Sequence, residues 1–224
     1  MIVNNTWEIN FSMQLVELVE LVELVEPAVR DNRKLLVLDI DSTLVWADYR
    51  EVPGADTVLW VRKVPVWVKK RPGLDAFLAY CFANYDVGIW SAASKEYVQK
   101  IAEYLISGIA ELTGVPRSWV FVMSGERCTQ HYSFNSSRDN YRMYVLKKLQ
   151  KIWTASKYKK YTRYNTLVVD DDSDTYLKNY GNAIPIAAYY GPSCDARDND
   201  VELVRVQKIL EAKRDIPNVR LSLK

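Results

Sequence analysis

The stretch KLLVLDIDSTLV, residues 34–45, decides how the rest of the chain is interpreted. Residues 35–38 form a short continuous apolar run, which is typical of a parallel strand that is buried on both faces. The run ends near Asp39 and Asp41, whose carboxylates point to the same side if the extended backbone continues past Leu38. Open α/β sheets bind ligands at the carboxyl ends of their strands, and two close carboxylates repel unless a cation or a lysine lies nearby. The stretch therefore predicts an acidic functional site, and the structural alternative is an acidic turn that caps the next helix.

The whole chain has the size and charge of one intracellular domain. It has 224 residues, enough for one α/β domain with a sizeable core, and its net charge of +2 indicates neither a nucleic acid nor an anionic membrane as partner. Cys81, Cys128 and Cys194 are widely spaced and form no CxxC pair, which argues against a disulfide framework or a zinc site and favours a reducing compartment. No apolar run reaches the roughly 20 residues of a membrane span, and residues 1–10 lack the features of a secretory signal. We expect a monomeric, intracellular protein of the nucleus or cytoplasm.

Residues 15–26 form a perfect triplet repeat, LVELVELVELVE, which ends at Pro27. A period of three matches neither the 3.6 residues of a helix nor the 2 residues of a strand, so the glutamates would drift around a helix axis. The repeat is either an amphipathic helix that binds a partner or a low-complexity extension. We favour the second interpretation, and we predict an N-terminal extension at residues 1–31 and a single domain at residues 32–224.

Beyond residue 45, apolar runs alternate with helical patterns. TVLWV at 57–61 and VPVWVKK at 64–70 flank a short turn, which predicts a β-hairpin inserted after the first strand. Residues 74–81 place apolar side chains at i, i+3, i+4 and i+7, as on one face of a helix. The alternation predicts an α/β fold with a doubly wound, mostly parallel sheet. The remaining predictions are strands at 85–90, 118–123, 165–169 and 183–189, helices at 95–112 and 201–213, a helix that follows the aspartates and ends at 180, an irregular polar segment at 124–140, and a helical or irregular segment at 141–152.

Two further strand ends carry polar residues. Ser91 follows the strand at 85–90, and a hydroxyl group there, followed by small residues and a helix, can bind a phosphate oxygen together with the backbone N–H groups. Taken alone, Ser91 could equally cap the helix. The strand at 165–169 runs into Asp170, Asp171 and Asp172, a loop that can offer one or two carboxylates to a hard cation.

Residues 157–164 alternate lysine and arginine with tyrosine. Such a mixture can bind nucleic acid through charge and stacking, but four cations in a chain of balanced charge favour a solvated basic face that could touch an acidic protein substrate. His131 is the only histidine, and we interpret it as incidental.

Four segments together resemble the four ordered motifs of the haloacid-dehalogenase-like phosphatases: DIDST at 39–43, WSAAS at 90–94, a lysine at 147 or 148, and VDDDSDTY at 169–176. Within that superfamily the chain resembles the CTD-phosphatase branch of FCP/SCP type. KRPGLDAFL at 70–78 and YDVGIWSAASKEYV at 85–98 are most similar to the members with a ubiquitin-like domain. Residues 1–33 are too short to form such a domain. The resemblance implies a Rossmann-like fold and phosphatase activity. Ser91 stands where the branch often has threonine, a change that should keep the hydroxyl contact.

The resemblance also implies roles for individual residues. Asp39 would be the nucleophile that forms an aspartyl-phosphate, and Asp41 would protonate the leaving oxygen and later activate water. Mg²⁺ would be bound by Asp39, by the backbone carbonyl of Asp41 and by Asp170 or Asp171. The phosphate-binding residues that we expect are Thr43, Ser91, Ala92 and Lys147, with Lys148 as the alternative lysine.

The expected substrate is a phosphoserine or phosphothreonine in a protein or peptide. The sequence has no large cap insertion at either of the positions usual in this superfamily, and an open site suits a protein loop better than a small metabolite. The alternatives are a phosphatase of small phosphate esters and a binding module that keeps the fold without the chemistry.

Overall fold

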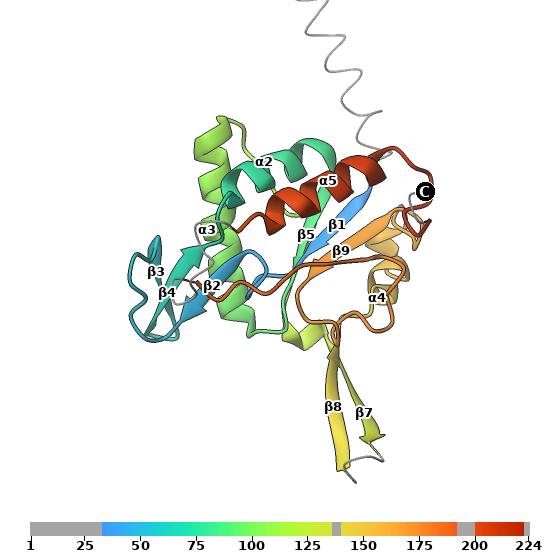
Figure 1. Cartoon of the computed structure of the whole chain (residues 1–224), viewed down its shortest axis with the longest axis horizontal. Helices are drawn as coiled ribbons and strands as arrows, with labels where there is room; N and C mark the ends of the chain where they lie inside the picture. Colours follow the sequence, from blue (N-terminus) through green and yellow to red (C-terminus); the bar gives the residue numbers. More distant parts are fainter. Residues whose placement is uncertain (1–32, 136–139, 192–199, 222–224) are drawn as a thin grey trace, which may run out of the picture. The chain divides into compact units, whose positions relative to one another are not determined.

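The computed structural model describes residues 33–135, 140–191 and 200–221. The predicted N-terminal extension at 1–31 lies outside the described residues, and so does Cys194. Residues from Lys34 onward form one compact unit. Its centre is a parallel sheet in the order β10-β9-β1-β5-β6 (Figure 1). The strands are β1 (Leu35–Leu38), β5 (Asp86–Trp90), β6 (Val122–Met123), β9 (Thr166–Asp170) and β10 (Ala183–Pro185).

Helices cover both faces of this sheet. The helices α2 (Leu74–Asn84), α3 (Lys95–Thr113) and α5 (Glu202–Arg214) share one hydrophobic core with Leu36 and Leu38 of β1. The opposite face of β1 packs against the short helix α4 (Gln150–Trp153), which lies beside the 3-10 turn η2 (Ser156–Tyr158). All four residues of β1 are therefore fully buried, as the continuous apolar run predicts. The predicted doubly wound α/β class is confirmed.

The predicted hairpin at 57–70 is also confirmed, and a third strand joins it. The sheet β2-β4-β3 is antiparallel and comprises β2 (Val45–Asp48), β4 (Val64–Lys70) and β3 (Thr57–Val61). Arg62 and Lys63 connect β3 to β4 with φ angles of 50° and 67°, the left-handed pair that a two-residue hairpin turn requires. Because β2 begins only four residues after Asp41, the insertion starts directly at the acidic loop.

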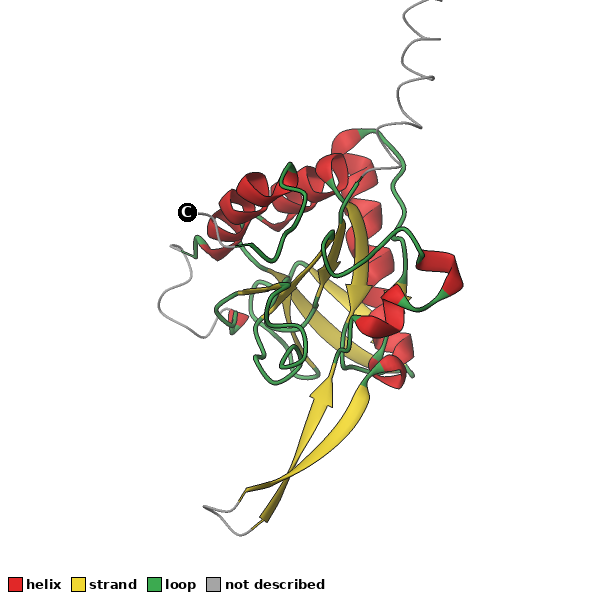
Figure 2. Ribbon diagram, turned by 90° about the vertical axis from the view of Figure 1, so that its right-hand side faces the viewer, coloured by secondary structure: helices red, strands yellow, loops and turns green. Residues whose placement is uncertain are grey.

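The prediction for residues 124–146 was wrong. Instead of an irregular segment, the strands β7 (Thr129–Asn135) and β8 (Asn140–Leu146) form an antiparallel hairpin that projects from the rest of the fold (Figures 1 and 2). Within the described residues these two strands pair only with each other. Both strands do alternate, since Tyr132 and Phe134 in β7 and Tyr141, Met143 and Val145 in β8 occupy every second position, but the polar residues around them obscured this pattern.

The helix predicted to end at residue 180 is replaced by successive turns. Asp170 accepts the backbone N–H of Asp172 at 3.0 Å, and Asp172 accepts that of Asp174 at 2.9 Å. These local side-chain bonds compete with the i→i+4 bonds of a helix. Two predicted strands are also shorter than expected, since β6 begins only at Val122 and β10 ends at Pro185.

Candidate active site

The acidic loop lies where the central strands end together. Leu38 is level with Ile89 of β5 and with Val169 of β9, so Asp39 and Asp170 meet at the carboxyl edge of the sheet. The backbone N–H of Asp39 continues the ladder by donating to the carbonyl of Val169 at 3.0 Å. The chain then reverses into β2 through Ser42, which has a φ of 57°. The predicted strand end therefore becomes a tight loop that holds its side chains in place.

Lys147 lies between the two carboxylates at the base of the site. Its Nζ donates to Oδ1 of Asp39 at 2.5 Å and to Oδ2 of Asp170 at 2.7 Å. Burial alone would lower the pKa of Lys147, but the charges of Asp39 and Asp170 outweigh burial and raise it. Lys147 is therefore a fixed cation, whereas Lys148 forms no ion pair with the described residues. Of the two candidate lysines, Lys147 is the one that contacts the acidic cluster.

The environment of Asp39 raises the pKa of its carboxyl group. Burial raises the pKa of Asp39 to about 8, the charges of Asp170 and Asp41 add to this rise, and Lys147 opposes it. A carboxylate nucleophile has to be ionised. A divalent cation next to Asp39 would favour the ionised form, because a bound metal ion is the largest local charge in such a site.

The donor atoms fit such a cation. Asp39, Asp170 and Asp171 each offer a carboxylate oxygen, and these oxygens lie within 4.8 Å of one another. Asp171 is oriented by Thr43, whose hydroxyl donates to its Oδ1 at 2.9 Å. A purely carboxylate set of hard oxygen donors suits Mg²⁺. The side chain of Asp41 lies outside this group, and the sequence prediction invoked only its backbone carbonyl.

Asp41 is held by two hydroxyl groups instead. Ser91 donates to Oδ2 of Asp41 at 3.2 Å, and the phenol of Tyr97 donates to Oδ1. Burial raises the pKa of Asp41, and the hydrogen bonds from Tyr97 and Ser91 limit the rise. Ser91 also accepts the backbone N–H of Ala93 at 3.0 Å, which orders the loop around Ala92. The phosphate contacts of Thr43, Ser91, Ala92 and Lys147 remain predictions.

Three residues that the sequence did not suggest hold these groups in place. Tyr97 of α3 is described above, and Thr175 donates to Oδ2 of Asp170 at 2.7 Å. The side-chain amide of Asn179 donates to the carbonyl of Lys147. Tyr97 lies three residues after the motif at 90–94 and Thr175 lies within the motif at 169–176, and these positions were the only signal in the sequence. Asn179 gave none.

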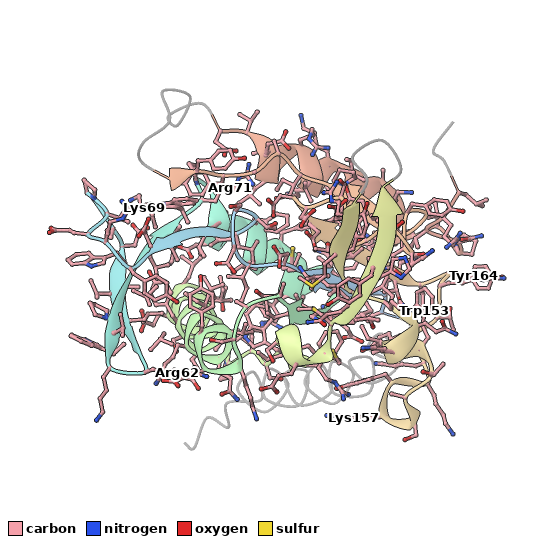
Figure 3. The ribbon with its side chains drawn as sticks, turned by 90° about the horizontal axis from the view of Figure 1, so that it is seen from below. Arg62, Lys69, Arg71, Trp153, Lys157 and Tyr164 are labelled. Carbon is pink, nitrogen blue, oxygen red and sulfur yellow. The ribbon has the colours of Figure 1, made fainter. Side chains whose placement is uncertain are left out.

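Arg71 connects the acidic loop to the end of the chain. Its side chain is almost fully buried, and Nη1 donates to the carbonyl of Thr43 at 3.1 Å. Nε donates to Asp200 at 3.0 Å and Nη2 to the carbonyl of Ala187 at 2.8 Å. Figure 3 shows Arg71 beside the start of α2. The guanidinium group therefore ties together three segments that are distant in the sequence.

A doubly wound sheet with a buried lysine among carboxylates at its carboxyl edge has the features of the haloacid-dehalogenase-like phosphatases. More particularly, residues 34–220 match the model of the NLI interacting factor-like phosphatase family, and the chain belongs to this family. The resemblance to CTD phosphatases inferred from the four motifs is thereby confirmed.

Curated relatives agree with this assignment. The chain is 27% identical over 195 residues to an uncharacterized FCP1 homology domain-containing protein of Schizosaccharomyces pombe, covering 84% of this chain and 75% of the relative. It is 26% identical over 194 residues to a probable C-terminal domain small phosphatase of Dictyostelium discoideum, with coverages of 85% and 54%. It is 30% identical over 184 residues to the ubiquitin-like domain-containing CTD phosphatase 1 of Xenopus laevis, with coverages of 81% and 50%. The chain thus spans about half the length of the latter two proteins.

Among solved structures, the fission yeast RNA polymerase II CTD phosphatase Fcp1 matches with a TM-score of 0.47 at 16% identity, covering 87% of this chain and 56% of that one.

None of the helices in the described ranges has the length and apolar character needed to span a membrane.

Proposed function

We propose that this chain is a magnesium-dependent protein phosphatase that acts on phosphoserine or phosphothreonine through an aspartyl-phosphate on Asp39. The observation that carries the proposal is the buried contact of Lys147 with Asp39 and Asp170, with Asp171 beside them. One cation of the protein faces three carboxylates there, an excess of negative charge that suits a divalent metal ion. We place the activity inside the cell, in the nucleus or cytoplasm, in a monomeric protein.

The side chains divide the reaction between them. The oxygen of Asp39 that Lys147 does not bind attacks phosphorus, and the bond from phosphorus to the leaving oxygen breaks. Asp41 gives its proton to that oxygen and then takes a proton from the water that hydrolyses the aspartyl-phosphate. Lys147, Thr43, Ser91 and the backbone at Ala92 bind the phosphate oxygens. When bound to Asp39, Asp170, Asp171 and the Asp41 carbonyl, Mg²⁺ would neutralise the repulsion between nucleophile and phosphate.

Turnover assays test the activity and the substrate class. We expect hydrolysis of p-nitrophenyl phosphate that requires Mg²⁺ and stops with EDTA, and a higher kcat/KM for phosphopeptides than for sugar or nucleotide phosphates. A clear preference for a small phosphate ester would refute the protein-substrate claim. An absence of turnover with every substrate would identify a binding module.

The metal ligands are distinguished by a pair of conservative variants. Asp170→Asn is expected to weaken Mg²⁺ activation on the order of a hundredfold, because Asp170 is buried and pairs with Lys147. Asp171→Asn is expected to weaken it only about tenfold, since Asp171 is partly exposed and an amide oxygen can still coordinate magnesium. Activity is titrated against Mg²⁺ concentration in both variants. Equal losses would contradict this division.

A third variant tests the proton transfer. Asp41→Asn leaves the nucleophile intact but cannot deliver a proton, so phosphoserine turnover is expected to fall roughly a hundred- to ten-thousandfold. p-Nitrophenol is an acidic leaving group that needs less protonation, so its release should fall less, provided that hydrolysis of the aspartyl-phosphate is not limiting. In rapid-quench measurements, a burst of the leaving alcohol reports formation of the aspartyl-phosphate, and release of inorganic phosphate reports its hydrolysis. An equal loss of burst rate with phosphoserine and with p-nitrophenyl phosphate would argue against Asp41 as the acid.

A further inference from the structure

A cleft of about 400 Å³ lies along the edge strand β6, outside the acidic cluster. Its walls come from α3, β6, η2 and the 3-10 turn η1 (Gly125–Arg127). The cationic residues that line it are Lys95, Arg127 and Lys157, all exposed, and Glu126 is the single acidic residue of its lining. We call this feature the basic cleft. Figure 3 shows Lys157 at the surface, extending from η2.

The positive charge of the basic cleft exceeds the negative charge of its lining, which is that of Glu126 alone. Among the described residues, Lys95, Arg127 and Lys157 form no ion pair. Glu96, which follows Lys95, is engaged by Arg62 of the β3–β4 turn, whose backbone N–H donates to it at 2.7 Å. A positively charged surface of this kind favours an anionic ligand, whose charge is opposite.

A fourth cation adds to this field. Nζ of Lys151 donates to the carbonyl of Arg127 at 2.8 Å and to that of Cys128 at 3.3 Å, which places its charge beside η1. The field is therefore built from α3, α4, η1 and η2, and it is not a property of one helix terminus.

The floor of the basic cleft suits an extended peptide. The rings of Phe121 and Tyr158 meet edge to face with centroids 5.4 Å apart, and Val122 is 38% exposed. Strand β6 is the last of its sheet and pairs on its other edge with no described strand. An unpaired strand edge beside apolar side chains is a common docking site for an extended peptide segment.

The basic cleft adjoins the loop that carries Ser91. The backbone N–H of Ser91 donates to the carbonyl of Met123 at 3.1 Å, and that of Gly125 donates to Ala93 at 2.8 Å. A Cβ atom at Gly125 would lie 2.3 Å from the carbonyl oxygen of Ala92, so glycine permits this close approach. The loop that carries Ser91 thus separates the cleft from Asp41, and one peptide can reach both.

We propose that the basic cleft binds an acidic segment, rich in aspartate and glutamate, that lies near the phosphorylated residue in the substrate protein. This inference rests on the proposed protein phosphatase activity and specifies its substrate class. Nucleic acid fits less well. Four cations contact only a short stretch of a phosphate backbone, whereas an apolar strand edge beside them can bind a short acidic peptide.

The test compares two phosphopeptides that differ only in flanking residues, three glutamates in one and three glutamines in the other. With the parent protein, kcat/KM should be about tenfold higher for the glutamate peptide, and added salt should reduce this ratio. Lys157→Glu should reduce the ratio at least about fivefold. The control Lys208→Glu makes the same charge change at an exposed position of α5, on the other face of the sheet, and should leave the ratio unchanged.

The proposal would be overturned if the ratio of kcat/KM for the glutamate peptide to that for the glutamine peptide were the same in the parent protein, Lys157→Glu and Lys208→Glu. It would also be overturned if a single-stranded oligonucleotide bound in a Lys157-dependent manner while the peptide ratio stayed constant. Fluorescence anisotropy with an unphosphorylated glutamate peptide separates this inference from the activity. Binding that Lys157→Glu abolishes, in a protein that turns over no phosphate ester, would support the basic cleft and refute the phosphatase.

Discussion

Asp39→Asn is expected to lower turnover by roughly four to six orders of magnitude, because an amide is too poor a nucleophile to attack phosphorus. The variant should still fold. Asparagine has nearly the same shape, its carbonyl oxygen can still accept the hydrogen bond from Lys147, and the repulsion from Asp170 and Asp41 disappears. The melting temperature of Asp39→Asn should therefore be at least that of the parent protein, and steady-state assays with p-nitrophenyl phosphate measure the loss of activity.

Beryllium fluoride gives a second readout of the same residue. It mimics an aspartyl-phosphate, so it should bind the parent protein in the presence of Mg²⁺ and fail to bind Asp39→Asn. Asp48→Asn on β2 is the matched control, because it makes the same chemical change at a partly exposed carboxylate and should behave as the parent protein does. Substantial turnover by Asp39→Asn would place the nucleophile elsewhere.

Arg71→Met is expected to lower the free energy of unfolding by about 3–5 kcal/mol. The substitution leaves the charge of Asp200 without its cationic partner at a site where its side chain is 13% exposed, and it removes the donors for the carbonyls of Thr43 and Ala187. Breaking a buried ion pair on one side costs this much because the remaining charge is uncompensated. Urea denaturation followed by tryptophan fluorescence measures the change.

The control for Arg71→Met is Arg50→Met. The side chain of Arg50 is 91% exposed, and its ion pair with Asp48 at 3.6 Å is of the surface kind that contributes about 0–1 kcal/mol. Arg71→Lys is a stricter variant, since lysine keeps the charge but cannot form the three-way contact of the guanidinium group. If the urea denaturation curves of Arg71→Met and Arg50→Met had similar midpoints and slopes, the contacts of Arg71 would not stabilise the fold.

The parts of the site that lie on buried strands were predictable. The apolar run at 35–38 and the runs before Ser91 and Asp170 each identify a strand whose end lies at one edge of the sheet, and the structure brings these ends together. Burial of the whole strand leaves a strong signal in the sequence because every position is apolar.

The parts that depend on contacts distant in the sequence were not predictable. The choice between Lys147 and Lys148 needs the orientation of β8, a strand that was not predicted from the sequence. Arg71 looks like an ordinary charged residue before a helix, and only the folded chain shows that it is buried. Polar residues whose partners lie far along the chain carry no local periodicity, so sequence patterns miss them.

The three-way contact of Arg71 also bears on how the protein is made. Arg71 and Asp200 are 129 positions apart, Thr43 and Asp171 are 128 apart, and Lys147 and Asp39 are 108 apart. Contacts of such high order close late, because the entropy of large loops must be lost before they form. During synthesis, Arg71 can pair with Asp200 only after the 129 positions that separate them have been made. The contacts that fix the acidic loop are therefore expected to close late in folding, once the segments that carry Lys147, Asp171 and Asp200 are all present.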